Sequence, residues 1–263
     1  MLLKMETTHV SGAGETHRGG RPSNQDVLIL EPELGLYAVL DGMGGAAAGE
    51  TAARLASEAL VEFIRKHSTS ERFTPRELLE FAIDRAAAAV YLAGKQRPEC
   101  SGMGTTVVAC LVTDATCVIV GHVGDSRAYL LREGRFQVLT RDHTIAQRFI
   151  DDGELSPDSA ERSFLKNILT RNLGDENGVQ AEMLEMTLQA GDRVLLCSDG
   201  LYGCVPPEAI QRVLGSGEAP KEIAQTLIKR ALKSGEATDN VSAVVLDVDP
   251  PSDAARRDRE LMA

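Results

Sequence analysis

Four short apolar segments follow one another without an intervening helix between residues 105 and 139, and this succession constrains the fold most strongly. The segments are rich in Val and Leu, are bounded by Gly or Asp, and span Thr105–Val112, Cys117–Val123, Ala128–Arg132 and Arg135–Leu139. Such segments are typical of β-strands, and the REGR stretch between the last two predicts a tight hairpin connection. Strands in direct succession favour antiparallel sheets over an alternation of strands and helices.

Further strands and four helices are predicted on either side of this region. Strands are expected at Leu36–Leu40, Val194–Cys197 and Val241–Val248. Apolar periodicity and N-terminal prolines predict helices at about Gly49–Lys66, Pro75–Ala93, Pro207–Val213 and Lys221–Lys233, the second capped by Thr74. Because the helices come in pairs and the strands in series, we expect an α+β fold. It is a sandwich of two antiparallel β-sheets flanked by pairs of α-helices, in four layers ordered αββα.

Length and composition indicate one globular domain. The chain has 263 residues, of which 43% are apolar, and it contains no repeat and no low-complexity linker. We therefore expect a single domain over residues 1–249 and a polar C-terminal tail over residues 250–263. The formal net charge of −11 repels a phosphate backbone, which disfavours nucleic-acid binding.

Cysteine usage and hydropathy predict the compartment. The five cysteines form no C-x-x-C pair and lie mostly in apolar segments, which is typical of buried, reduced thiols. The N-terminus is too short and too polar for a secretory signal, and no run approaches the ~18 apolar residues of a membrane span. We expect a soluble, cytoplasmic protein that does not bind membranes.

Aspartates recur at the ends of the predicted strands. Asp41, Asp125 and Asp199 follow strands, whereas Asp26 and Asp239 stand just before them. A turn explains any one of them, because Asp is common in turns and often bonds its own backbone. The whole set is harder to explain in this way. Several carboxylates projecting toward one point would repel one another unless a cation lay among them.

The residue types around these aspartates favour hard cations and a phosphate. Oxygen ligands without His or Cys select Mg²⁺ or Mn²⁺ over zinc. A Gly follows both Asp41 and Asp199, and Gly lets a backbone carbonyl approach a ligand closely. Arg21 stands five residues ahead of Asp26 and offers a planar fork of donors that matches phosphate oxygens. A lone Arg in a loop is also typical of a solvated surface charge.

Eight short motifs occur in succession along the chain: RPSNQD, VLDGMGG, GMGTT, GHVGDSRAYL, LTRDHT, LTRNLG, LLCSDG and TDNVSAVVL. In this order they resemble the motifs of the protein phosphatase 2C (PPM) family in its compact bacterial form. The resemblance extends from about Thr8 to Val248. It implies the same sandwich with a two-metal centre at one end, and the activity of a metal-dependent protein serine/threonine phosphatase.

The resemblance also implies which residues hold the metals, two Mn²⁺ or Mg²⁺ ions. Asp41 corresponds to the aspartate that bridges both ions, and the carbonyl of Gly42 corresponds to a ligand of the second. Asp199 and Asp239 correspond to the remaining ligands of the first ion. A third ion is often seen in bacterial members at the equivalents of Asp125 and Asp199, and its necessity for catalysis is left open.

The neighbouring residues have implied roles as well. Asp26 corresponds to a carboxylate that holds metal-bound water, with Gln25 and Asn240 beside it, and Arg21 corresponds to the arginine that binds phosphate. A hydroxide bridging the two ions would attack phosphorus in line, without a covalent phospho-enzyme, while Arg21 offsets charge on the phosphoryl oxygens. A chelator should therefore abolish activity.

Three positions depart from the family pattern. Gln25 stands where Glu is common, which should weaken the water network at the second metal. Met43 stands where eukaryotic members carry a His proposed as general acid, and Ala46 replaces a His found in bacterial members. All direct metal ligands are present, so we expect activity. His122 and His143 are interpreted as core, rim or turn residues and not as metal ligands.

The polar segment from about Thr144 to Lys166 corresponds to a mobile flap beside the site in bacterial relatives. A loop of this length in a compact domain is usually functional or flexible. We expect the flap to shape access for a phosphorylated protein substrate, which is a Ser/Thr kinase, one of its targets or another regulator. The protein is expected to act in signalling as a monomer.

Two other interpretations are weighed against a phosphatase. The sequence GMGGAA from Gly42 to Ala47 satisfies the dinucleotide-binding pattern G-x-G-x-x-A, but the chain does not continue as repeated βα units. Gln25 is compatible with a pseudophosphatase that binds phosphoproteins without turnover. Such a protein should have lost a metal ligand, whereas all the direct aspartate ligands are retained here.

Overall fold

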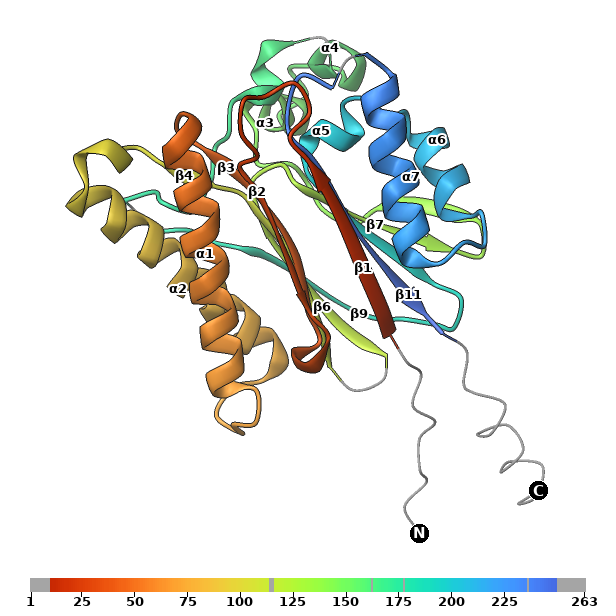
Figure 1. The fold of residues 1–263 in the computed structure, drawn as a ribbon, viewed down its shortest axis with the longest axis horizontal. Coiled ribbons are helices and arrows are strands. Elements are labelled where there is room, and N and C mark those ends of the chain that lie inside the picture. The colour runs from red at the N-terminus through yellow and green to blue at the C-terminus, as the bar shows by residue number, and fades with distance from the viewer. Residues whose placement is uncertain (1–9, 114–115, 162, 177, 236, 250–263) are drawn as a thin grey trace.

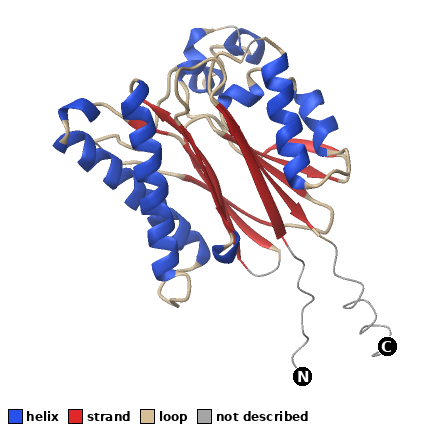
Figure 2. Cartoon of the chain, viewed as in Figure 1, coloured by secondary structure: helices blue, strands red, loops and turns tan. Residues whose placement is uncertain are grey.

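Two antiparallel sheets pack face to face in the computed structural model, which describes residues 10–113, 116–161, 163–176, 178–235 and 237–249. Helices cover the outer face of each sheet (Figure 1), and the helical and strand layers are distinguished in Figure 2. This is the α+β four-layer sandwich that the sequence predicts. The polar tail expected over residues 250–263 lies outside the described residues.

Every strand pair in the described residues is antiparallel. The first sheet has the order β1 (Val10–His17), β11 (Val241–Val248), β10 (Arg193–Cys197), β7 (Arg127–Arg132) and β8 (Arg135–Val138). The second has the order β2 (Asp26–Glu31), β3 (Leu36–Met43), β5 (Val107–Thr113), β6 (Cys117–Val123) and β9 (Glu182–Thr187), and β4 (Gly104–Thr105) pairs with β3. The predicted strand over residues 105–112 is thus broken at Thr106, between β4 and β5.

The sequence does not predict β1 and β9. Strand β9 is largely exposed and polar, so it lacks the apolar signal of a buried strand. Strand β1 contains Gly12 and Gly14 where the sheets approach closely. A Cβ on Gly12 would lie 2.5 Å from Cε1 of Tyr37, so the packing between the sheets requires a residue with low strand propensity.

The REGR stretch forms the predicted hairpin. Arg132 pairs with Arg135 across β7 and β8. The two turn residues, Glu133 and Gly134, have φ angles of 50° and 77°. Positive φ at both central positions is the geometry of a two-residue turn whose twist matches that of the strands.

Alternating residues of the central strands fill three separate cores. In β3, Ala38 and Leu40 face the helices on the second sheet, whereas Tyr37 and Val39 lie between the sheets. Strand β11 alternates in the same way between the inter-sheet core and the helices on the first sheet. Because both faces of these strands are buried, they appear in the sequence as continuous apolar runs.

Two long helices cover the second sheet and two shorter ones cover the first. They are α1 (Ala46–His67) and α2 (Pro75–Gln96), then α6 (Pro207–Leu214) and α7 (Pro220–Lys233), close to the predicted spans. Thr74 caps α2 as predicted. Its hydroxyl accepts from the Glu77 N–H at 3.3 Å, and the Glu77 carboxylate accepts from the Thr74 N–H at 2.8 Å. No helix within the described residues combines the length and apolar character needed to cross a membrane.

Short helices gather at the upper end of the sandwich in Figure 1. They are α3 (Ile145–Asp151), α4 (Pro157–Glu161) and α5 (Asp199–Tyr202), with the 3-10 turn η3 (Phe164–Asn167) beside α3 and α4. Two further 3-10 turns, η1 (Pro32–Leu34) and η2 (Pro98–Cys100), lie elsewhere. The segment over residues 144–166, expected to be a loop, is therefore partly helical.

Candidate active site

A cavity of about 930 Å³ collects most of the predicted site residues. Its lining includes Arg21, Gln25, Asp41, Gly42, Asp125, Asp199 and Asp239. Asp26 and Asn240 do not line it and lie buried. The residues predicted to act together are far apart in the chain, and the fold brings them to one place.

Antiparallel pairing explains this convergence. The end of one strand and the start of its neighbour meet at the same edge of a sheet, so Asp26 in β2 pairs directly with Asp41 in β3. Asp199 follows β10 and Asp239 precedes the adjacent β11 in the other sheet. Asp125 lies between β6 and β7, where the chain passes from one sheet to the other. The structure corrects one detail, since Asp26 and Asp41 are strand residues and not turn residues beyond the strands.

The backbone of Asp41 is fixed by the break between β4 and β5. Its carbonyl accepts hydrogen bonds from the Thr106 N–H at 2.8 Å and from the Thr105 hydroxyl at 2.9 Å. Its N–H donates to Thr106 Oγ1 at 3.1 Å. Neither threonine was singled out from the sequence, although both belong to the GMGTT motif. Their role depends on a strand that is distant in the chain.

Four of the aspartates repel one another in a buried setting. Burial and the neighbouring carboxylates raise the pKa of Asp41 well above its usual value. Burial, followed by other carboxylates, also raises the pKa of Asp199 to about 6, of Asp26 to about 7 and of Asp125 to about 8. A divalent cation among these groups would offset the repulsion.

Two carboxylate oxygens support the same conclusion. Among the described residues, Asp26 Oδ1 and Asp199 Oδ1 are buried and accept no hydrogen bond. A buried charged oxygen without a donor is costly unless another positive group satisfies it. The residues present therefore fit an oxygen-coordinated Mg²⁺ or Mn²⁺ centre.

Arg21 pairs with Asp239 in the lining of the cavity, and both side chains are partly exposed. Arg21 Nη2 donates to Asp239 Oδ2 at 2.7 Å, and the backbone N–H of Asn240 donates to Asp239 Oδ1 at 2.8 Å. The hydrogen bond to Asp239 raises the pKa of the Arg21 guanidinium, which stays charged. Because 51% of the Arg21 side chain is exposed, its cation can meet an anion that enters the cavity.

Arg127, a second arginine in the cavity lining, already has its guanidinium bound by other side chains of the protein. Arg127 donates to both carboxylate oxygens of Asp142, at 2.8 and 2.7 Å, and lies 3.8 Å from the ring centroid of Tyr202. The Tyr202 hydroxyl donates to the carbonyl of Asp125 at 3.0 Å. Arg127 therefore supports the loop that carries Asp125, and Arg21 is the better candidate for binding phosphate.

The Asn240 side chain forms hydrogen bonds to the backbone of the loop that carries Arg21. Its Oδ1 accepts from the Gln25 N–H at 2.9 Å, and its Nδ2 donates to the carbonyls of Arg18 and Ser23, also at 2.9 Å. The Gln25 side chain donates to the Gly45 carbonyl at 2.8 Å, on the loop before α1. Both residues thus act on the shape of the loops around the cavity.

Close backbone packing explains the glycine at position 42. A Cβ on Gly42 would lie 2.1 Å from the carbonyl oxygen of Gly49 in α1. Any larger residue would push α1 away from β3. The predicted ligand carbonyl of Gly42 thus sits where the strand, the helix and the cavity meet.

Comparison with known proteins identifies the family. A family model described as protein phosphatase 2C matches residues 13–238. The chain belongs to the protein phosphatase 2C family. The serine/threonine protein phosphatase PstP of Mycobacterium tuberculosis is 36% identical over 228 residues, which cover 87% of this chain and 43% of PstP. The chain thus spans less than half the length of that relative.

Two further comparisons cover nearly the whole relative. The serine/threonine phosphatase stp of Listeria innocua is 33% identical over 239 residues, which cover 88% of this chain and 93% of that protein. The solved structure of the PstP catalytic domain in complex with two manganese ions superposes with a TM-score of 0.81 at 34% identity. It covers 92% of this chain and 99% of that chain. The predicted family and fold are confirmed.

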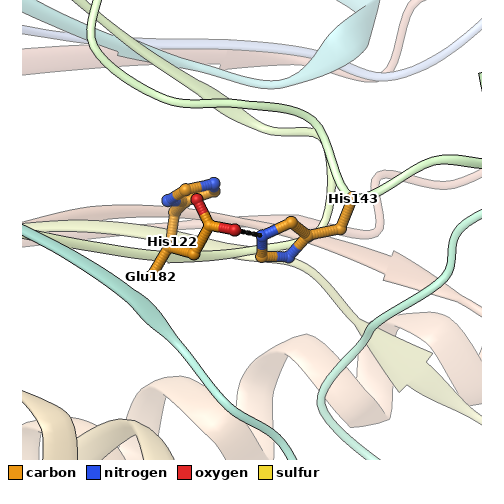
Figure 3. A group of neighbouring side chains, drawn as sticks. All are labelled: His122, His143 and Glu182. Carbon is orange, nitrogen blue, oxygen red and sulfur yellow. Dashed lines mark ion pairs between the residues drawn. The ribbon is translucent and has the colours of Figure 1, made fainter. Parts of the chain in front are cut away.

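A cluster outside the phosphatase 2C cavity contains His122, His143 and Glu182 (Figure 3). One ligand atom from each lies within 4.8 Å of the others. However, the Gly124 N–H donates to His143 Nδ1 at 3.2 Å, and His143 Nε2 lies 3.2 Å from both Glu182 Oε1 and Arg171 Nη1. Arg171 Nη1 lies 3.3 Å from the same Glu182 oxygen, Oε1.

The Arg171 cation, in contact with both His143 and Glu182, disfavours a further cation at the histidine cluster. Burial, His122 and the Arg171 cation lower the pKa of His143 to about 4, so the ring is neutral near pH 7. His122 Nε2 lies 2.9 Å from the carbonyl of Arg141 and donates to it. His122, interpreted as a core or rim residue, and His143, interpreted as a turn or cap residue, are both buried and hydrogen-bonded to the backbone.

The predicted flap forms one wall of the cavity. Thr144, Gln147, Ile150 and Lys166 line the cavity together with Arg21 and the aspartates, and Ile168 lines it as well. Thr144 Oγ1 accepts from the Gln147 N–H at 3.1 Å and caps α3. The flap therefore contributes to the space in which a substrate would lie.

Proposed function

We propose that this chain is a metal-dependent protein serine/threonine phosphatase, and that residues 1–249 form its catalytic domain. The observation that carries the proposal is the convergence of Asp41, Asp125, Asp199 and Asp239 on one cavity that Arg21 also lines. The names of the phosphatase 2C relatives support the reaction type, the hydrolysis of phosphoserine and phosphothreonine.

The donor set indicates which residues would hold the ions. Asp41, Asp199 and Asp239, with the carbonyl of Gly42, would hold two Mn²⁺ or Mg²⁺ ions. Asp125 with Asp199 would hold a third. The buried, unpartnered oxygen of Asp199 and the raised aspartate pKa values support an uncompensated negative site. The complex of PstP with two manganese ions supports the choice of metal.

Other groups of the protein would bind the phosphate, orient the water and hold the surrounding loop. Bound divalent cations supply an activated water and offset the charge of the phosphoryl group. Arg21 would hold two phosphate oxygens and fix the direction of the seryl or threonyl leaving oxygen. Asp26 Oδ1 would accept a hydrogen bond from water beside Asp41, and Asn240 would hold the loop that carries Arg21. Met43, which lines the cavity, donates no proton, so the leaving oxygen would take its proton from water.

The two rival interpretations find no support in the described residues. The wholly antiparallel sheets differ from the parallel sheet of a dinucleotide-binding domain. A pseudophosphatase should lack a metal ligand, whereas all the predicted ones line the cavity.

The cellular setting is part of the proposal. We propose a phosphorylated protein substrate, a Ser/Thr kinase or one of its targets, and a monomeric protein that acts in cytoplasmic signalling. Cys100, Cys110 and Cys197 are buried free thiols, which is consistent with a reducing compartment.

Hydrolysis of a phosphothreonine peptide and an aryl phosphate in Mn²⁺ tests the function. Wild type should turn over both, and a chelator should abolish turnover. Asp41→Asn and Asp239→Asn should each lower kcat/KM by more than about 100-fold, because loss of even an indirect partner of a metal costs about 10–100-fold. Asp84→Asn, a surface change on α2, serves as the matched control and should be unaffected. Equal rates in chelator would exclude the mechanism.

A further inference from the structure

A pair of buried serines binds one oxygen of Asp26. Ser242 Oγ donates to Asp26 Oδ2 at 2.6 Å, and Ser198 Oγ donates to the same oxygen at 2.8 Å. Both serines have no exposed surface, and only 6% of Asp26 is exposed. Hydrogen bonds from hydroxyls to a buried carboxylate are strong and directional.

Counting donors gives these hydrogen bonds a direction. Ser242 Oγ also lies 2.7 Å from Thr16 Oγ1, and a hydroxyl has only one proton to donate. Because Ser242 gives its proton to Asp26, Thr16 must donate to Ser242. Thr16 in turn accepts from Asn24 Nδ2 at 2.8 Å. The hydrogen bonds therefore form a series in which Asn24 donates to Thr16, Thr16 donates to Ser242, and Ser242 donates to the Asp26 carboxylate.

Ser198 is oriented in the same way from the other side. Its oxygen accepts the backbone N–H of Ser242 at 3.0 Å, so its own proton is directed at Asp26. Asn24 Oδ1 accepts the Asp26 N–H at 3.2 Å and holds the start of β2. Asp26 Oδ2 is thus saturated by protein donors, whereas Oδ1 is the buried oxygen left to take a further donor.

The hydrogen bonds join the two halves of the metal centre. Asp26 and Asp41 belong to the second sheet, whereas Ser242 lies in β11 of the first sheet and Ser198 and Asp199 directly follow β10 of that sheet. The ligands predicted for one ion therefore come from both sheets. Side-chain contacts between the sheets at this end control the spacing of those ligands.

We propose that Ser198 and Ser242 are positioning residues, which hold the Asp26 carboxylate with Oδ1 toward the reacting water and fix the spacing of the two sheets at the metal centre. This inference rests on the proposed function for the role of Asp26. The serines touch neither substrate nor metal and act through Asp26. Thr16, at the outer end, orients the Ser242 hydroxyl.

A double-mutant cycle with Asp26 tests the proposal. Ser198→Ala and Ser242→Ala should each lower kcat on a phosphothreonine peptide by about 10–100-fold, with KM nearly unchanged. In an Asp26→Ala background the same changes should have almost no further effect, because the group they position is gone. Ser57→Ala removes another buried serine hydroxyl, in α1, and should leave kcat unchanged. Equal losses in both backgrounds would overturn the proposal.

Thr16, at the outer end of this hydrogen-bond series, allows a milder substitution than those at the two serines. Thr16→Val preserves shape but removes the hydroxyl, whereas Thr16→Ser retains it. We expect Thr16→Val to lower kcat and Thr16→Ser to keep the wild-type rate. Equal kcat values for the two variants, at equal Tm, would contradict the predicted direction of the hydrogen bonds from Thr16 through Ser242 to Asp26.

Calorimetric titration of metal-free protein with Mn²⁺ separates the two proposals. The serine variants should bind Mn²⁺ about 10-fold more weakly or worse, and the loss should again disappear in the Asp26→Ala background. A wild type that binds Mn²⁺ with this coupling but does not hydrolyse phosphopeptides would overturn the proposed function alone. An active wild type whose serine variants bind Mn²⁺ normally would overturn the positioning role alone.

Discussion

Arg21 and Asp239 form an ion pair at 2.7 Å, although they are assigned to different ligands. The pair places the cation predicted to bind phosphate directly beside a predicted metal ligand, so a phosphate held by Arg21 would also lie beside the ions. The two side chains remain 51% and 37% exposed, and an exposed pair of this kind contributes little to stability. Their proximity is therefore better explained by substrate binding than by folding.

Arg21→Ala should lower kcat/KM on a phosphothreonine peptide by about 10–100-fold, because hydrogen bonds to a charged group contribute about 1.5–3 kcal/mol. Arg21→Lys should restore only part of the loss, since Lys lacks the planar fork. Mn²⁺ affinity, measured by calorimetry, should not fall in Arg21→Ala. Arg54→Ala, an exposed arginine on α1, is the control. An unchanged kcat/KM in Arg21→Ala would exclude Arg21 from phosphate binding.

At the scale of elements, the site is divided between rigid strands and one separate wall. Asp41, Asp199 and Asp239 lie on or beside the strands β3, β10 and β11, which are buried on both faces, and this fixes their spacing. The flap wall instead consists of the short elements α3, α4 and η3, and Phe164 in η3 is 75% exposed. This division predicts that the flap affects large substrates more than small ones.

Replacing residues 152–163 by a short Gly-Ser linker tests that division. We expect a lower kcat/KM on a phosphoprotein and an unchanged rate on an aryl phosphate, because the segment contributes none of the predicted metal ligands. The same linker placed between α6 and α7, on the outer face of the first sheet, is the control. Unchanged kinetics on the phosphoprotein would remove the proposed role of the flap.

For the whole molecule, the acidic cluster couples stability to pH and metal. Folding raises the pKa of Asp199, Asp26 and Asp125 from 3.8 to about 6, 7 and 8. Each group therefore binds its proton more tightly in the folded state. The stability linked to it is fully present below pH 3.8 and is lost as pH rises through the folded-state pKa.

The Tm of chelated protein should therefore fall between about pH 4 and pH 8. Saturating Mn²⁺ should raise the Tm most at the upper end of this range, because the ions offset the carboxylate charge and bind only the folded state. Calorimetry at several pH values, with chelator or with Mn²⁺, provides the measurement. Asp125→Asn should flatten the fall near pH 8. A Tm that rises with pH in chelator would contradict the prediction.

The sequence alone determined the features that depend on local signals. The periodicity of α1 and α7, the Thr74 cap and the β7–β8 hairpin are encoded within a few neighbouring residues. The ordered motifs also indicated the family, and the aspartates at predicted strand ends indicated a cation site. The individual roles of these site residues stay predictions.

Only the tertiary structure decided the contacts between distant parts of the chain. Ser198 and Ser242 reach Asp26 across 172 and 216 residues, and no local pattern marks them as its partners. Strand β1 uses Gly12 because a side chain there would collide with Tyr37 in the other sheet. Periodicity and turn signals describe a segment's own conformation. The packing of two sheets decides which hydroxyl meets which carboxylate.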